Sequence, residues 1–168
     1  MARHRRLAHP LVQLAFFLLV VSLLHLFQTR EMLADKEVAP SFELSDLTGQ
    51  RIRLSDFAGK KTVIYFMAPW CTICKVSFPA LQALHKATSS EEIAVLAIAL
   101  SYQNQKEVAD FAGTATLPVL LGQESTGRDY RITAFPTLYV IDKEGRIASR
   151  SLGLATTAFM TREALVSF

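Results

Sequence analysis

The chain has few of the residue patterns that metal, phosphate and nucleic-acid sites need. It contains two cysteines and four histidines in 168 residues, and three of those histidines lie near the N-terminus. A closed zinc site needs four ligands, so the two cysteines would supply only half of one. No glycine-rich phosphate loop and no internal repeat is present. The formal net charge of +3 comes partly from N-terminal arginines. We therefore expect no bound metal, no cofactor and no nucleic-acid partner.

Both cysteines, Cys71 and Cys74, lie in the motif WCTIC at residues 70–74. Residues 62–67 before it form an apolar run rich in β-branched and aromatic side chains, which predicts a buried strand. In residues 75–87 after it, apolar side chains recur at nearly helical spacing. The cysteines are therefore expected where a strand ends and a helix begins.

This position would make a thiol reactive. A helix N-terminus offers unpaired N–H groups and the positive end of the helix dipole, and both lower the pKa of a cysteine there. Residues three apart share a helix face, so Cys71 and Cys74 can form a redox disulfide. We predict that Cys71 is the exposed nucleophile and that Cys74 resolves the mixed disulfide.

Residues 1–33 are predicted to form a basic N-terminus and a membrane anchor. The apolar run at residues 11–27 would extend ~26 Å as a helix at ~1.5 Å per residue, at the short end of what spans a bilayer. A cleaved signal peptide is the alternative, but no small-x-small cleavage motif follows Phe27. The N-terminal arginines should stay in the cytoplasm. This interpretation places a domain of residues 34–168 on the other side of the membrane.

The rest of the chain alternates strand and helix patterns and then ends in a hairpin and a helix. Such an order predicts an α/β fold with a mixed central sheet flanked by helices. Residues 31–40 are polar and are interpreted as a linker. The further elements expected are an N-terminal hairpin at 42–54, strands at 93–100, 118–121, 138–141 and 146–151, and helices at 107–111, 124–130 and 156–168.

Three sequence features resemble the thioredoxin superfamily. The segment 63–75 resembles its active-site signature, and Pro79 matches the proline that kinks its active-site helix. Phe135-Pro136-Thr137 before a strand resembles its cis-proline segment. The resemblance implies a thioredoxin-like fold with Pro136 in a cis peptide beside Cys71.

Within that superfamily, residues 38–168 most resemble the membrane-anchored TlpA/ResA/CcmG-type disulfide reductases. The resemblance rests on the hairpin that ends at residues 54–60, the extra strand and helix between 93 and 130, and the motif at 139–145. A weaker similarity, through the anchor and residues 153–162, points to the ScsD-like branch associated with copper tolerance.

The resemblance also implies which residues bind the substrate chain. The family uses the cis-proline segment to exclude metals and to pair with the substrate backbone, so Phe135, Pro136 and Thr137 would line the site. Trp70 would form part of the docking surface; the alternative is an ordinary core aromatic at the end of a strand.

The chain departs from the family in the proton acceptor for Cys74. Many thioredoxins carry a buried acid where this chain has Tyr65, and ResA-type proteins carry an acid inside the motif, where Thr72 and Ile73 are neutral. The base for Cys74 could therefore be Tyr65, a bound water or an acid from another loop. Lys75 could stabilise a thiolate or simply be solvated.

The motif also bears on the direction of electron flow. No histidine separates the cysteines, whereas strong oxidants of the superfamily typically carry one, so we expect a reductase. The resemblance implies substrates of the cytochrome c maturation or copper-tolerance type. The compartment of such a reductase is oxidising, which implies a transmembrane thiol donor of the DsbD/CcdA type. The expected location is the bacterial inner membrane, single pass, with the N-terminus cytoplasmic and the catalytic domain periplasmic. A disulfide oxidase or isomerase of the same fold, and a copper-thiolate binding module, are the alternatives.

Overall fold

The computed structural model describes residues 5–30, 32–88 and 92–153. The chain divides into two compact units, Met1–Glu31 and Met32–Phe168. The first contains one helix, α1 (Arg5–Arg30), with Pro10 inside it. Among the described residues, no helix combines the length and the apolar character needed to cross a membrane. The assignment of residues 1–33 as an anchor and 34–168 as an extracytoplasmic domain stays a prediction.

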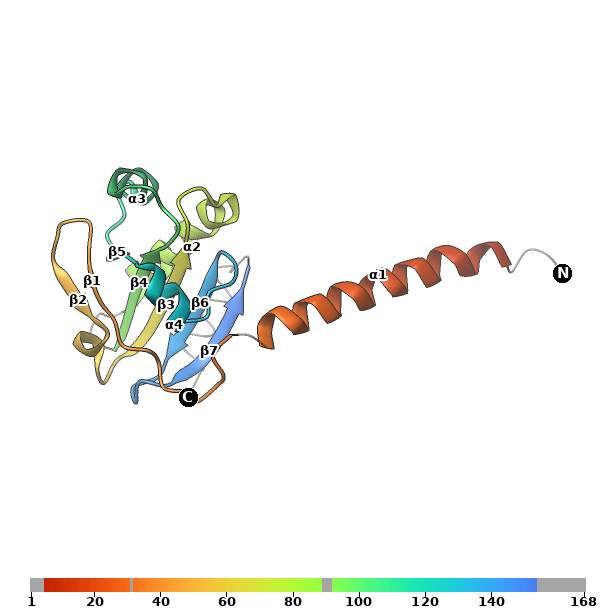
Figure 1. The fold of residues 1–168 in the computed structure, drawn as a ribbon, viewed down its shortest axis with the longest axis horizontal. Helices are drawn as coiled ribbons and strands as arrows, with labels where there is room; N and C mark the ends of the chain where they lie inside the picture. The colour runs from red at the N-terminus through yellow and green to blue at the C-terminus, as the bar shows by residue number, and fades with distance from the viewer. Residues whose placement is uncertain (1–4, 31, 89–91, 154–168) are drawn as a thin grey trace. The chain divides into compact units, whose positions relative to one another are not determined.

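The second unit is built on a five-stranded sheet with the order β5-β4-β3-β6-β7 (Figure 1). β4 runs parallel to β3 and β5 parallel to β4, whereas β6 pairs antiparallel with β3 and β7 antiparallel with β6. The predicted mixed sheet is therefore confirmed. Its strands are β3 (Lys61–Met67), β4 (Ile93–Ala99), β5 (Val119–Leu121), β6 (Thr137–Ile141) and β7 (Ile147–Leu152).

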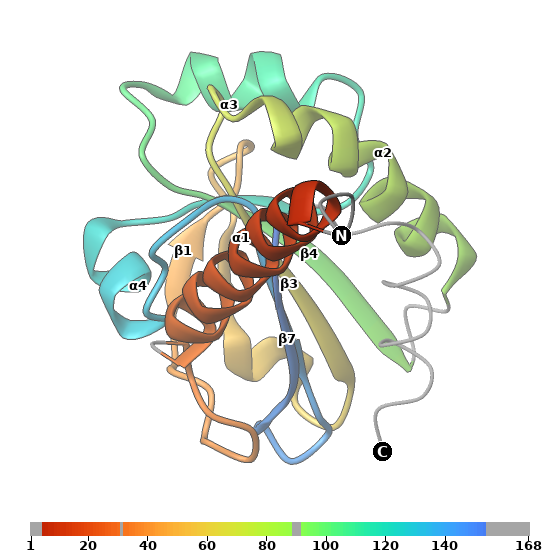
Figure 2. The ribbon, with the colours of Figure 1, turned by 90° about the vertical axis from the view of Figure 1, so that its right-hand side faces the viewer.

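The central strand β3 separates two layers of core. Successive side chains of a strand point to opposite faces, and six of the seven residues of β3 are buried. Val63, Tyr65 and Met67 pack in one cluster with residues of α2 (Thr72–Ala87) and α3 (Gln105–Ala112). Ile64 and Phe66 pack in a second cluster on the other face, which includes Tyr130 at the end of α4 (Glu124–Asp129). Figure 2 shows α2 and α3 together on one side of the sheet.

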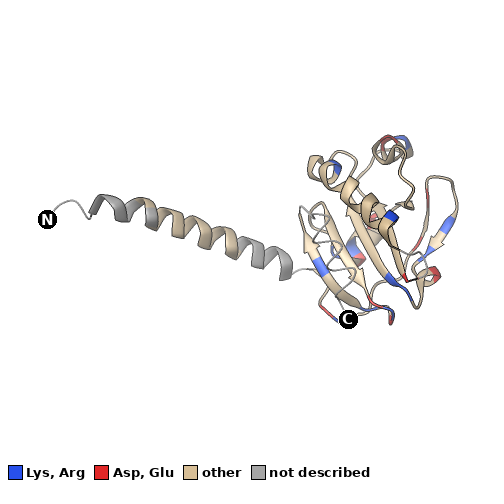
Figure 3. Ribbon diagram, turned by 180° about the vertical axis from the view of Figure 1, so that it is seen from behind, with Lys and Arg blue, Asp and Glu red and all other residues tan. Residues whose placement is uncertain are grey.

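A separate hairpin precedes the sheet, as predicted for residues 42–54. It consists of β1 (Glu43–Ser45) and β2 (Arg51–Arg53), paired antiparallel, with Gly49 at φ 89° in the turn. A short 3-10 helix, η1 (Leu54–Phe57), leads from the hairpin to β3. An isolated antiparallel bridge between Asp46 and Leu120 places the hairpin beside β5. Figure 3 shows charged residues of the second unit on the hairpin, loops, helices and strands.

The boundaries of the remaining elements agree with the sequence within a few residues. α3 begins at Gln105, two residues earlier than predicted, because the Asn104 side chain accepts a hydrogen bond from the N–H of Glu107 and caps the helix. The helix predicted for residues 156–168 lies outside the described residues, as does most of the 153–162 segment that resembles the ScsD-like branch.

The linker predicted for residues 31–40 is wrong for residues 32–40. This segment, called the N-terminal strap below, lies along β7 and exchanges backbone hydrogen bonds with it. The N–H of Lys36 donates to the carbonyl of Ile147 at 2.8 Å, and the N–H of Ile147 donates to the carbonyl of Glu37 at 2.8 Å. Val38 and Arg146 form an antiparallel bridge. The strap carries charged side chains at residues 35–37, but its backbone pairs with β7 at the edge of the sheet.

Both ends of the strap are fixed to buried tyrosines. Leu33 is 2% exposed, and its N–H donates to the hydroxyl of Tyr139 at 3.1 Å. At the other end, the Tyr130 hydroxyl donates to the carbonyl of Pro40 at 2.7 Å. The Arg150 guanidinium donates to the carbonyl of Leu33. The strap is thus an integral part of the second unit.

Candidate active site

The two cysteines lie where β3 leads into α2 and form a disulfide, with their Cα atoms 5.2 Å apart. Cys71 is the N-cap of α2, and its Sγ accepts a hydrogen bond from the backbone N–H of Cys74 at 3.2 Å. A sulfur in this position faces the unpaired N–H groups of the first helical turn. The first turn of α2 contains no acidic residue, so no carboxylate there offsets the stabilisation of a Cys71 thiolate.

The two cysteines differ in exposure. Cys71 is 7% exposed, whereas Cys74 is 0% exposed. A second thiol or disulfide can approach only Cys71 without a change in the structure. This difference supports the prediction that Cys71 is the nucleophile and Cys74 the resolving cysteine. The two roles stay predictions.

Tyr65 lies beneath the disulfide and is fully buried. Its hydroxyl donates to the backbone carbonyl of Cys74 at 3.5 Å. Burial raises the pKa of the Tyr65 phenol far above its ordinary value, so the phenol is neutral at physiological pH and acts as a hydrogen-bond donor. Tyr65 is therefore disfavoured as the base for Cys74. No Asp or Glu within the described ranges is buried, which leaves a partly exposed acid or a water.

The segment at residues 135–137 meets the cysteine motif. The Phe135–Pro136 peptide bond is cis, which confirms the prediction. Pro136 and Thr137 are buried, and the Thr137 hydroxyl donates to the carbonyl of Ala134 at 2.8 Å. The half-buried ring of Phe135 packs edge-on against Trp70, with the ring centroids 5.9 Å apart. The structure therefore brings Trp70 and Phe135 together, as their predicted shared role requires.

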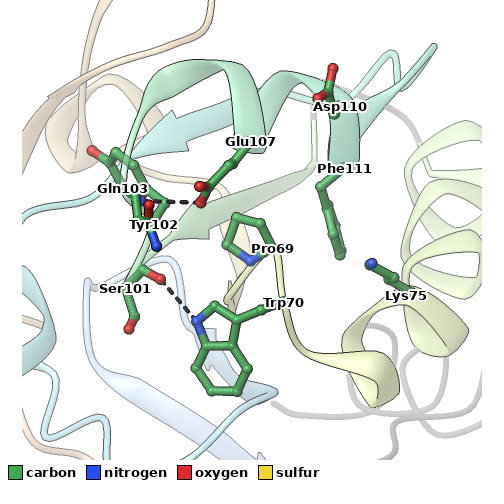
Figure 4. A pocket seen from close by; sticks show the side chains of 9 residues that line it. All are labelled: Pro69, Trp70, Lys75, Ser101, Tyr102, Gln103, Glu107, Asp110 and Phe111. Carbon is green, nitrogen blue, oxygen red and sulfur yellow. Dashed lines mark hydrogen bonds between the residues drawn. The ribbon is translucent and has the colours of Figure 1, made fainter.

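Trp70 is 62% exposed. The alternative that it is an ordinary core aromatic is therefore wrong. Its Nε1–H donates to the backbone carbonyl of Ser101 at 2.9 Å (Figure 4). Sequence analysis missed Ser101, because a contact through a backbone carbonyl leaves no trace in residue type. Its position directly after the predicted strand 93–100, which neighbours the cysteine-bearing strand, was the only available signal.

The other predicted residues lie on the outer surface of α2. Thr72, Ile73 and Lys75 are all exposed. Lys75 faces a groove of about 670 Å³ between α2 and α3 (Figure 4), and Glu107 and Phe111 line the opposite wall from α3. The remaining lining residues are Pro69, Trp70, Ser101, Tyr102, Gln103 and Asp110. Among the residues that the structure describes, no group of three or more His, Cys, Asp or Glu could hold a metal ion.

Comparisons with known proteins agree with this geometry. The AhpC/TSA family pattern matches residues 36–150. The thioredoxin-like protein YneN of Bacillus subtilis is 33% identical over 129 residues, which cover 74% of this chain and 75% of that protein. The thiol-disulfide oxidoreductase ResA of the same organism is 28% identical and covers 80% of this chain and 76% of that protein. The crystal structure of StoA from Bacillus subtilis superposes with a TM-score of 0.66 at 27% identity, covering 75% of this chain and 97% of StoA. A thioredoxin family thiol:disulfide interchange protein from Chlorobium tepidum gives a TM-score of 0.72 at 25% identity, covering 80% and 97%.

Proposed function

Because the chain belongs to the AhpC/TSA family of thioredoxin-like proteins, and is a thiol-disulfide oxidoreductase of the ResA and StoA type, we propose that it is a membrane-anchored reductase of extracytoplasmic protein disulfides. One observation carries the proposal. Cys71, which is 7% exposed, caps α2, whereas Cys74 is 0% exposed, and neutral Thr72 and Ile73 separate the two.

The geometry supports a two-step exchange. The Cys71 thiolate attacks one sulfur of a substrate disulfide, the substrate S–S bond breaks, and the second substrate sulfur leaves as a thiolate. The resulting mixed disulfide joins Cys71 to the substrate. Cys74 then loses its proton and attacks the Cys71 sulfur, which releases the first substrate sulfur as a thiolate. The substrate gains two electrons, and the enzyme is left with the Cys71–Cys74 disulfide.

The surface around Cys71 favours proteins over small thiols as substrates. In the described part of the second unit, the exposed large apolar side chains are Val38, Trp70, Ile73 and Val76. Three of these four lie within seven residues that include both cysteines. Clustered exposed apolar side chains mark protein-binding surfaces more often than random surface. The substrates that we propose are extracytoplasmic proteins of the cytochrome c maturation or copper-tolerance type.

Anchoring is proposed from the sequence of the first unit. Most of positions 11–27 are apolar and follow an arginine-rich start, a pattern that favours a single pass with the N-terminus in the cytoplasm. A bacterial inner membrane location would place the cysteines in the periplasm. A membrane thiol carrier of the DsbD/CcdA type would then return the electrons, and the anchor would raise the local concentration of one partner near the other.

Labelling of the full chain in spheroplasts tests the proposal. A membrane-impermeant maleimide should modify Cys71 without prior reduction, because a reductase is held in its dithiol state outside the cytoplasm. A Cys71→Ala variant is the matched control and should lose most of the label, since Cys74 is 0% exposed. Labelling that appears only after lysis would contradict the location. Labelling that appears only after dithiothreitol treatment would contradict the reductase.

A further inference from the structure

Ser101 has an unusual backbone for its residue type. It lies two residues after β4 ends at Ala99, and its φ is 54°. This left-handed region is unfavourable for residues with a Cβ, and serine is not among the residues enriched there. Such conformations persist where the surroundings impose them, and they concentrate at functional sites.

The surroundings fix the chain on both sides of Ser101. Before it, the N–H of Leu100 donates to the carbonyl of Met67 at 2.8 Å. After it, the half-buried Tyr102 donates its hydroxyl to the carbonyl of Gly122 at 3.2 Å. Gly122 is itself held by β4, because its N–H donates to the carbonyl of Ala99 at 2.9 Å. The turn at Ser101 is therefore held by the sheet.

The backbone conformation of Ser101 sets the position of its own carbonyl. That carbonyl accepts the Nε1–H of Trp70 at 2.9 Å (Figure 4), while Phe135 packs edge-on against the same indole at an interplanar angle of 84°. Trp70 is thus held by two elements although its side chain is 62% exposed. Most exposed side chains exchange between rotamers in picoseconds to nanoseconds. The contacts on this indole instead fix one orientation before a partner arrives.

We propose that Ser101 is a positioning residue, whose left-handed backbone holds Trp70 in the orientation that receives protein substrates. This inference rests on the proposed function of reducing protein disulfides. Preorganisation of a docking side chain lowers the entropy lost on binding. It does not alter the sulfur chemistry of Cys71, so its loss should raise KM and leave kcat unchanged.

Two substitutions in the full chain, purified in detergent, separate the backbone from the side chain. Valine is β-branched and strongly disfavours a positive φ, so Ser101→Val should displace the carbonyl. Glycine adopts a positive φ readily, so Ser101→Gly is the matched control and should behave as the parent chain. Tyr102→Phe removes the hydroxyl that holds the loop and provides a second variant should valine prevent folding.

The readouts are independent of one another. Trp70 is the only tryptophan of the chain, so time-resolved fluorescence anisotropy reports its motion directly. The second readout is KM and kcat for insulin, with dithiothreitol as reductant, beside the rate with the small disulfide dithiobis(nitrobenzoate). Ser101→Val should free the indole and raise KM for insulin by roughly tenfold, the size of a typical interface contact. The value of kcat and the rate with the small disulfide should not change. The KM and the indole mobility of Tyr102→Phe should lie between those of the parent chain and those of Ser101→Val.

Any other outcome of these measurements contradicts either the positioning role of Ser101 or the proposed function. Unchanged anisotropy and KM in Ser101→Val, or in Tyr102→Phe if valine does not fold, would overturn the positioning role. An equal rise of KM in Ser101→Gly would show that the serine side chain acts, and would also overturn it. A parent chain that reacts with the small disulfide but not with insulin would refute the proposed function, while the anisotropy would still decide whether Ser101 holds Trp70.

Discussion

Replacement of Cys71 by alanine is expected to abolish the reduction of protein disulfides, with a fall in rate of roughly 10³-fold or more, as for other catalytic nucleophiles. Cys71 is the cysteine that a partner can reach, and Cys74 is 0% exposed behind it. Cys74→Ala should instead preserve the first attack and remove the second. The variant should therefore accumulate mixed disulfides between Cys71 and its substrates.

Non-reducing electrophoresis of cell extracts after acid quenching measures both effects. Cys74→Ala should give new bands that disappear on reduction, and mass spectrometry should place the linkage at Cys71. Cys71→Ala should give none, and the double variant Cys71→Ala/Cys74→Ala is the control for non-specific thiol capture. Equal trapping by the two single variants would reverse the assignment of nucleophile and resolving cysteine, and no trapping by either would argue against covalent exchange.

Tyr139→Phe is expected to lower the free energy of unfolding by roughly 1–3 kcal/mol. The Tyr139 hydroxyl accepts from the N–H of Leu33 at 3.1 Å and donates to the carbonyl of Tyr130 at 3.0 Å. Both partners are buried, so removal of the hydroxyl leaves two backbone groups without their side-chain partner. The ring itself would keep its edge-on contact with Phe66, whose centroid lies 6.1 Å away.

Urea unfolding of the full chain in detergent, followed by circular dichroism, measures the loss. The matched control is Tyr102→Phe, which removes a single hydrogen bond from a half-buried hydroxyl and should cost less. Protection of the Leu33 amide from hydrogen exchange should fall in Tyr139→Phe but not in the control. Equal stability of the two variants would show that the strap does not contribute to the fold through Tyr139.

The cysteine motif and the sheet could be predicted because their signals are local. A continuous apolar run, a helical spacing and a cis-proline segment each lie within a few residues, and the structure confirms β3, α2 and the cis bond before Pro136. The WCTIC motif and the residues around it resemble a well-defined family. The resemblance therefore also predicted the order of strands and helices along the chain.

The strap could not be predicted because its partners are far away in the sequence. Lys36 pairs with Ile147 through backbone atoms alone. The charged side chains at residues 35–37 instead predicted a linker. Ser101 was missed for a related reason, since its contribution lies in a φ angle and a carbonyl. The role of Tyr65 also depended on the fold, because burial, which raises its pKa, is not encoded in its residue type.

The equilibrium reduction potential of the Cys71–Cys74 pair, measured on the full chain in detergent against glutathione or dithiothreitol buffers, tests the central claim most directly. A reductase should have a potential near or below about −220 mV, toward that of thioredoxin. A potential near about −120 mV, as in the strong oxidant DsbA, would contradict a reductase and assign the same cysteines to disulfide formation.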